Sequence, residues 1–330
     1  MINVSRLYCG IASESDNFRY LKNSGLVAVY NCTRKCSQNC LHCYSKNGST
    51  DKELDTKQAK ELLNQLAENK CSVVLFSGGE PLERTDLFEL LAYSHSLGLR
   101  TVLSTNGNLI NAAIAEKLVN AGVKYAGISV DGTEKTHDSF RGIAGSFQSA
   151  VRAINFCKEV NLKVGLRFTI TNRNFSQVRD IFSLAEKLRI QRICFYHLIP
   201  VGEAVKNNLK CTDEQIRSAL NEILSCSKEF SSKGVTEVLT VGNQADGAFI
   251  LNRLKQENSP LYEKSLSLLE QFGGNKADAK IFDIDASGNV HPDQFHQDFT
   301  MGNITQQKLR DIFEGYIKNQ NLKCKIADSA

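Results

Sequence analysis

Tryptophan is absent from the 330 residues, and the chain has only two methionines and four prolines. Its longest apolar runs, such as residues 26–30 and 73–76, are far shorter than the roughly 20 residues that span a bilayer. Residues 1–10 have neither the basic flank nor the apolar stretch of a signal peptide. These absences predict a cytoplasmic protein without a membrane segment.

An excess of one charge is also missing, since 40 Lys and Arg residues against 36 Asp and Glu residues leave a net charge of +4. So small a charge, spread along the chain, excludes a broad surface for nucleic acid or for anionic membranes. With 22 glycines and 42% hydrophobic residues, collagen-like and disordered chains are excluded as well. We therefore expect a globular protein whose recognition of anions is local.

Cysteine, by contrast, is abundant. Eleven cysteines are an odd number, which disfavours a disulfide framework in a cytoplasmic chain and favours thiolate ligation of metal. Cys32, Cys36, Cys40 and Cys43 lie close together, whereas the other cysteines are scattered. We expect most of the scattered ones to be small buried side chains.

From about residue 25, short runs rich in β-branched residues alternate with stretches of helical period. Asp55, with Gln58 three residues later, is the expected N-cap of the first helix. The pattern predicts an α/β fold, a partial (β/α)6 TIM-type barrel, with its ligand site at the carboxyl ends of the strands. The expected strands span residues 27–31, 72–77, 100–104, 125–129, 163–170 and 192–197.

Two further regions flank this core barrel, which we expect over residues 25–233. Thr212 and Gln215 form a capping box that opens its last helix, which reaches about residue 230. Residues 234–330 form a smaller α+β domain in this interpretation, with a strand near 237–241, helices near 248–257 and 261–272, and a hairpin over 281–291. An N-terminal extension, residues 1–24, is expected to run over the barrel surface.

The strongest chemical signal is Cys36-Ser-Gln-Asn-Cys40-Leu-His-Cys43, directly after the first expected strand. Three thiolates at this spacing can hold three corners of a [4Fe–4S] cluster and leave the fourth iron open for an exchangeable ligand. A zinc site that includes Cys32, or an electron-transfer cluster with four protein ligands, also fits the loop. The loop therefore predicts metal binding, with an open iron–sulfur cluster favoured.

A second signal, Ser77-Gly78-Gly79-Glu80-Pro81, ends the next expected strand. The glycines let a ligand approach the backbone, and Pro81 keeps Glu80 out of helical geometry. Peptide carbonyls and a carboxylate are then available to accept hydrogen bonds from an ammonium group. Such a stretch is usually a tight turn when it occurs alone, but its position beside the cysteine loop favours a ligand site.

These motifs, together with Ser104-Thr105-Asn106-Gly107 and Ser129-Val130-Asp131-Gly132, follow one another in an order that resembles the radical S-adenosylmethionine (SAM) superfamily. The resemblance covers about residues 25–230. It implies a [4Fe–4S] cluster and SAM as cofactors, and a 5′-deoxyadenosyl radical that abstracts hydrogen from a substrate.

The same resemblance implies a role for each residue of the site. The cluster is bound by Cys36, Cys40 and Cys43, and the SAM amino group by Gly78, Gly79 and Glu80. Arg167 pairs with the SAM carboxylate. The ribose lies near Asn106 and Ser129, and the adenine near Tyr44 and Ile199.

Further stretches resemble the tetrapyrrole-modifying branch of this superfamily, which includes pre-haem d1 synthases and iron-coproporphyrin synthases. They are residues 5–10, 165–170, 195–200, 243–247 and 290–295. The resemblance implies removal of acetate or propionate side chains from a sirohaem-derived tetrapyrrole, and an electron donor such as ferredoxin or flavodoxin.

A tetrapyrrole with carboxylates and a central iron needs cations and an imidazole near it. We favour His291 as the catalytic residue because it lies in the distinctive stretch Val290-His291-Pro292-Asp293-Gln294-Phe295. The other candidates for contact with the substrate are Arg34, Arg141, His197 and His296.

Relatives in this branch usually continue into a cysteine-rich tail that binds an auxiliary cluster, whereas this sequence stops at Ala330 with only Cys324 in that region. We therefore expect residues 234–330 to be a truncated SPASM-like domain without that cluster. Two other functions stay open, a peptide-modifying radical SAM maturase and a noncatalytic iron–sulfur partner subunit.

Overall fold

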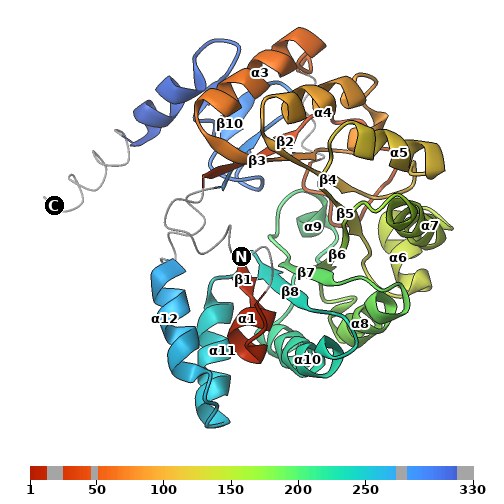
Figure 1. Cartoon of the computed structure of the whole chain (residues 1–330), viewed down its shortest axis with the longest axis vertical. Coiled ribbons are helices and arrows are strands. Elements are labelled where there is room, and N and C mark those ends of the chain that lie inside the picture. Colours follow the sequence, from red (N-terminus) through yellow and green to blue (C-terminus); the bar gives the residue numbers. More distant parts are fainter. Residues whose placement is uncertain (13–24, 46–50, 273–280, 318–330) are drawn as a thin grey trace, which may run out of the picture.

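The computed structural model describes residues 1–12, 25–45, 51–272 and 281–317 (Figure 1). Its strands are Ile2–Asn3 (β1), Leu26–Asn31 (β2), Cys71–Ser77 (β3), Arg100–Thr105 (β4), Tyr125–Ser129 (β5), Val164–Ile170 (β6), Arg192–His197 (β7), Glu237–Val241 (β8), Ile281–Ile284 (β9), Asn289–His291 (β10) and Gly302–Asn303 (β11). They form one sheet in the order β1-β8-β7-β6-β5-β4-β3-β2-β9-β10-β11. Neighbours from β8 to β9 are parallel, so their carboxyl ends share one edge of the sheet.

Helices cover the outer face of these parallel strands in an arc (Figure 1). An apolar parallel sheet needs such cover on its faces, and the connection between parallel strands supplies it. The helices are Val4–Cys9 (α1), Thr56–Glu68 (α3), Leu87–Ser96 (α4), Ala112–Asn120 (α5), Glu134–Arg141 (α6), Ser146–Glu159 (α7), Val178–Lys187 (α8), Glu203–Lys206 (α9), Asp213–Ser231 (α10), Ala245–Gln256 (α11) and Tyr262–Phe272 (α12). None of the helices in the described ranges is long and apolar enough to cross a bilayer.

The six expected strands are confirmed as β2 to β7, and the predicted partial barrel with them. Both capping boxes form. Asp55 accepts a hydrogen bond from Gln58 N while the Gln58 side chain accepts one from Asp55 N, and Thr212 and Gln215 do the same at α10. Local sequence signals therefore determine where these helices begin.

The expectation for the N-terminus is wrong over its described part. Ile2–Asn3 pairs antiparallel with β8, and α1 packs on the sheet with Val4 and Leu7 fully buried. The Ser5 hydroxyl accepts a hydrogen bond from Val238 N (2.9 Å). Residues 1–9 are thus part of the core, because they cover the otherwise open edge of β8. Residues 13–24 lie outside the described ranges.

The expected hairpin near residues 281–291 is present as β9 and β10, with Gly288 at a φ of +86° in its turn. However, β8 and β9 pair in parallel with β7 and β2 of the barrel. The predicted boundary after residue 233 therefore falls within one continuous sheet, and the C-terminal strands extend the barrel at both of its sides.

Candidate functional site

A pocket lies at the carboxyl ends of the parallel strands. The structure brings together there all the predicted cofactor residues except Glu80. They come from six different strands or from the loops that follow them, which is the arrangement expected of a barrel ligand site. These lining residues are Cys36, Cys40, Cys43, Tyr44, Gly78, Gly79, Asn106, Ser129, Arg167 and Ile199.

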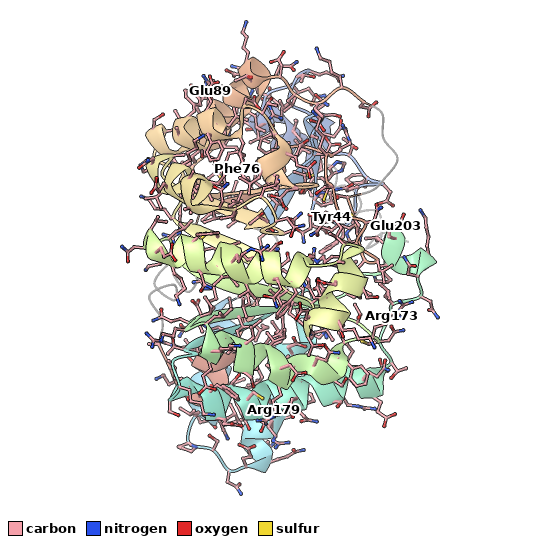
Figure 2. The ribbon with its side chains drawn as sticks, turned by 90° about the vertical axis from the view of Figure 1, so that its right-hand side faces the viewer. Tyr44, Phe76, Glu89, Arg173, Arg179 and Glu203 are labelled. Carbon is pink, nitrogen blue, oxygen red and sulfur yellow. The ribbon has the colours of Figure 1, made fainter. Side chains whose placement is uncertain are left out.

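Backbone hydrogen bonds from three sides fix the cysteine loop. Gly79 N donates to Thr33 O and Glu80 N to Lys35 O, both at 2.7 Å. On the other side Leu41 N donates to Phe140 O (2.9 Å), and Glu203 N to Cys43 O (3.1 Å). Figure 2 shows Tyr44 and Glu203 near each other on the same side of the molecule.

The cysteine sulfurs lie among hydrogen-bond donors. Gln38 N is 3.4 Å from Cys36 Sγ, and Arg141 Nη1 is 3.5 Å from Cys40 Sγ. Burial raises the pKa of Cys36 to about 11 and also raises that of Cys40, although the Arg141 charge acts in the opposite direction. Without iron these thiols hold their protons, so metal binding must release them.

This donor set fits the predicted three-cysteine cluster site. The three sulfurs line one pocket, whereas Cys32 is fully buried outside it and burial raises its pKa to about 12. Within the described ranges, no three His, Cys, Asp or Glu side chains converge as ligands of a single metal ion. Cys36, Cys40 and Cys43 would hold the cluster, with donors placed to stabilise their thiolates.

The Gly78–Gly79 turn makes close approach to the cysteine loop possible. A Cβ on Gly78 would lie 2.4 Å from Thr33 O, and one on Gly79 would lie 2.3 Å from Lys35 O. Gly78 also has a φ of +131°, which side chains rarely tolerate. Glycine is therefore required here both to bring the two loops together and to present backbone groups to the pocket.

Glu80 lies behind this turn rather than on the pocket wall. Its carboxylate accepts hydrogen bonds from Thr105 Oγ1 (2.7 Å) and Asn106 N (2.8 Å), and burial raises its pKa to about 7. The prediction that Glu80 itself meets the amino group is therefore corrected. The pocket-facing part of the motif is the glycine backbone, and Glu80 ties that turn to the loop after β4.

Arg167 is the predicted partner of a carboxylate, and it projects from β6 into the pocket. Its guanidinium lies 4.5 Å from the centre of the Tyr196 ring, which holds its plane in place. Arg141 also lines the pocket, but its Nη2 pairs with the buried Asp131 Oδ2 at 2.5 Å. The Arg141 guanidinium is therefore already paired with Asp131 and Cys40. Arg167 is the arginine better placed to bind a carboxylate in the pocket.

His291 is not among the residues that line the pocket. It is 2% exposed, and its Nδ1 is 2.8 Å from Phe299 O. Its Nε2 is 3.7 Å from Asp285 Oδ2 and has no hydrogen-bond partner. The assignment of His291 as the catalytic residue is therefore corrected: this side chain braces the β9–β10 hairpin, because β10 directs it into the interior.

Sequence reasoning missed Asp283, a fully buried carboxyl group on β9. Asn31 Nδ2 donates to Asp283 Oδ1 (2.8 Å), and the Tyr44 hydroxyl donates to Asn31 Oδ1 (3.2 Å). Burial raises the pKa of Asp283 to about 8. The available signal was an acidic residue inside the otherwise apolar strand Ile281–Ile284. This chain of hydrogen bonds links the C-terminal hairpin to Tyr44 on the pocket wall.

Comparison with known proteins agrees with this geometry. The model of the radical SAM superfamily matches residues 30–185. Fe-coproporphyrin III synthase of Methanosarcina barkeri is 39% identical over 95% of this chain and 83% of the relative. Pre-heme d1 synthase of Dinoroseobacter shibae is 34% identical over 88% of this chain and 73% of the relative.

Solved structures share the fold. Streptococcus suis SuiB bound to its precursor peptide SuiA superposes with a TM-score of 0.70 at 20% identity, covering 87% of this chain and 64% of SuiB. The enzyme anSMEcpe with bound AdoMet gives 0.67 at 18% identity, covering 88% of this chain and 80% of anSMEcpe. At such identities the likeness concerns the fold alone.

Proposed function

Because the chain belongs to the radical SAM superfamily, within its tetrapyrrole-modifying branch, we propose that this enzyme removes acetate or propionate side chains from a sirohaem-derived iron tetrapyrrole. The observation that carries the radical chemistry of the proposal is one pocket that combines three cysteine sulfurs, a glycine cradle and Arg167. The names of the two relatives support an iron tetrapyrrole as the substrate.

Together, a [4Fe–4S] cluster and SAM supply hydrogen-atom abstraction from carbon. The residues of the chain position these groups. Cys36, Cys40 and Cys43 hold the cluster, the Gly78–Gly79 backbone receives an ammonium group, and Arg167 pairs with a carboxylate. We expect a small electron-transfer protein such as ferredoxin or flavodoxin to reduce the cluster.

Other residues shield the pocket from water. Phe295 lines it, and its ring centre lies 5.4 Å from that of Tyr44 in an edge-to-face contact. Leu198 and Ile199 add an apolar wall after β7. A radical that abstracts hydrogen must be kept from solvent and side reactions, and this apolar contact between the hairpin region and the cysteine loop contributes that protection.

The test is turnover by the reconstituted protein under anaerobic conditions with SAM, a strong reductant and didecarboxysirohaem. We expect 5′-deoxyadenosine together with a tetrapyrrole whose mass has fallen by whole side chains. Cys40→Ala is the matched control and should yield neither product. If deoxyadenosine forms while every tetrapyrrole stays intact, the substrate assignment is wrong and a peptide substrate becomes the better hypothesis.

A further inference from the structure

Two stretches that lie far apart in the sequence meet beside the pocket. His197 ends β7, and Asp246 lies in the first turn of α11, just after β8. The His197 Nε2 and Asp246 Oδ2 atoms are 2.8 Å apart. Gly242 permits this meeting, since its φ is +88° and a Cβ there would lie 3.3 Å from His197 O.

This pair is buried at the edge of the site. The side chains of His197 and Asp246 are 7% and 1% exposed. His197 lines the same pocket as the cysteine sulfurs and Arg167, whereas Asp246 lies behind it. The second oxygen of Asp246, Oδ1, is buried without a hydrogen-bond partner. Burying a carboxylate costs desolvation free energy. We therefore infer that the His197–Asp246 pair at the pocket wall has a role beyond packing.

The hydrogen bond determines which atom of the imidazole serves a ligand. When Asp246 accepts the Nε2 proton of a neutral imidazole, the other ring nitrogen, Nδ1, carries a lone pair. A lone pair binds a metal or accepts a proton, but it repels the oxygens of a carboxylate. Carboxylate behind histidine is also the usual arrangement at metal sites, where it orients the ring and raises its basicity.

We propose that His197 is an axial ligand to the iron of the tetrapyrrole substrate and that Asp246 is its positioning residue. The inference rests on the proposed function, because it requires an iron tetrapyrrole in this pocket. The iron belongs to the substrate, and coordination fixes the macrocycle at one point. Arg167, on the neighbouring strand β6, supplies a positive charge to the same pocket.

The proposal differs from recognition of the substrate through its carboxylates alone. Iron coproporphyrin III and metal-free coproporphyrin III carry the same carboxylates and differ in the metal. A protein with an axial histidine should bind the iron form more tightly, whereas carboxylate recognition treats the two alike. The experiment is a titration of the reconstituted protein with both macrocycles, followed by absorption in the Soret region and by electron paramagnetic resonance.

We expect His197→Ala to weaken binding of iron coproporphyrin III by more than the roughly ten- to a hundred-fold loss typical when an outer-shell partner of a metal ligand is removed, and to change the spin state of its iron. Binding of the metal-free macrocycle should stay unchanged. Added imidazole should restore the spectrum of the wild-type complex. Asp246→Asn should give a smaller loss of affinity and a shifted spectrum, because the ring keeps a hydrogen-bond partner without its charge.

His95→Ala is the matched control, since His95 is exposed on α4 away from the pocket. Iron content and the far-ultraviolet circular dichroism spectrum show whether His197→Ala keeps its fold. Equal affinity of the wild-type protein for the two macrocycles, or a wild-type spectrum in His197→Ala, would overturn the role of His197. If neither macrocycle nor any sirohaem derivative binds, the proposed function itself fails, and this inference fails with it.

Discussion

Arg141 lies between a buried carboxylate and Cys40, a proposed cluster ligand. Its guanidinium pairs with Asp131 (2.5 Å) and donates to Cys40 Sγ (3.5 Å). Burial alone would raise the pKa of Asp131, but the Arg141 charge lowers it below its usual value. The ionised Asp131 thus holds Arg141 against the thiolate, where a charged donor stabilises the more negative, reduced state of a cluster.

We predict that Arg141→Lys lowers the midpoint potential of the cluster. Lysine keeps the positive charge that pairs with Asp131. It lacks the planar guanidinium that contacts both Asp131 and Cys40, so the hydrogen bond to the Cys40 sulfur is lost. A redox titration followed by electron paramagnetic resonance measures the shift. Arg152→Lys, at an exposed position on α7, is the control. An unchanged potential with full iron content would show that Arg141 does not act on the cluster.

A second prediction concerns Asp283 and pH. Its pKa is about 8 in the folded protein, whereas an unfolded aspartate titrates near pH 4. Between these values the folded state binds one more proton, so this group makes stability fall as pH rises, by up to about 1.4 kcal/mol per pH unit, and its effect becomes constant above about pH 8.

Asp283→Asn removes this titration and can keep the hydrogen bond from Asn31. Its stability relative to the wild type should therefore increase from about pH 4 to about pH 8, as measured by urea unfolding. Asp298→Asn, at an exposed position, serves as control. A difference between Asp283→Asn and the wild type that does not change with pH would show that Asp283 is ionised in the folded protein.

Residues that form one local motif could be predicted from the sequence, and residues that meet across the fold could not. Cys36, Cys40 and Cys43 share a single loop, so their spacing alone brings their sulfurs together. In contrast, the neighbours of His291 and His197 depend on which elements pack against β10 and β7. Sequence reasoning therefore favoured His291, although His197 lines the pocket and His291 does not.

The same distinction holds for the elements. Strands β2 to β7 are short runs rich in apolar and β-branched residues, separated by stretches of helical period, and each was predictable from its own residues. The placement of β8 and β9 was not predictable in this way. Strand β9, for example, pairs with β2, from which it is separated by most of the chain. The short β1 and α1 carry too few residues for a periodic signal, and only their pairing with β8 shows that they belong to the core.

An element-scale prediction concerns the turn after β3. In Gly79→Ala the new methyl group would lie 2.3 Å from Lys35 O, so the cysteine loop must move away. We expect lower iron retention after anaerobic reconstitution and a loss of stability of about 1–3 kcal/mol, as for other overpacked sites. Gly315→Ala is the control, because a Cβ there has no neighbour within 4 Å. Full iron content and unchanged stability in Gly79→Ala would contradict the close approach.

At the scale of the whole molecule, the pocket depends on both ends of the sheet. Phe295 contacts Tyr44 from the C-terminal side, and Asp283 reaches Asn31 at the end of β2. On the opposite side of the barrel, α11 supplies Asp246 to His197. Residues beyond the predicted barrel therefore complete its mouth, which explains why the resemblance to tetrapyrrole-modifying enzymes extended past residue 233.

The last prediction is that the chain binds one cluster, with about four irons. Among the described cysteines, Cys36, Cys40 and Cys43 line the pocket, and Cys71, Cys157, Cys194 and Cys226 are buried elsewhere. Burial raises the pKa of Cys157 and of Cys226 to about 12, which disfavours thiolate ligands there. Cys324 lies outside the described ranges.

The decisive variant changes Cys36, Cys40 and Cys43 to alanine together. If these residues hold the only cluster, its iron content after anaerobic reconstitution should fall from about four per chain to near zero. Cys157→Ala, which leaves the pocket untouched, should retain all of its iron. About eight irons in the unaltered chain, of which about four remain in the triple variant with the absorption of an intact cluster, would locate a second cluster on the other cysteines. About four irons in both proteins would place the one cluster on cysteines other than these three.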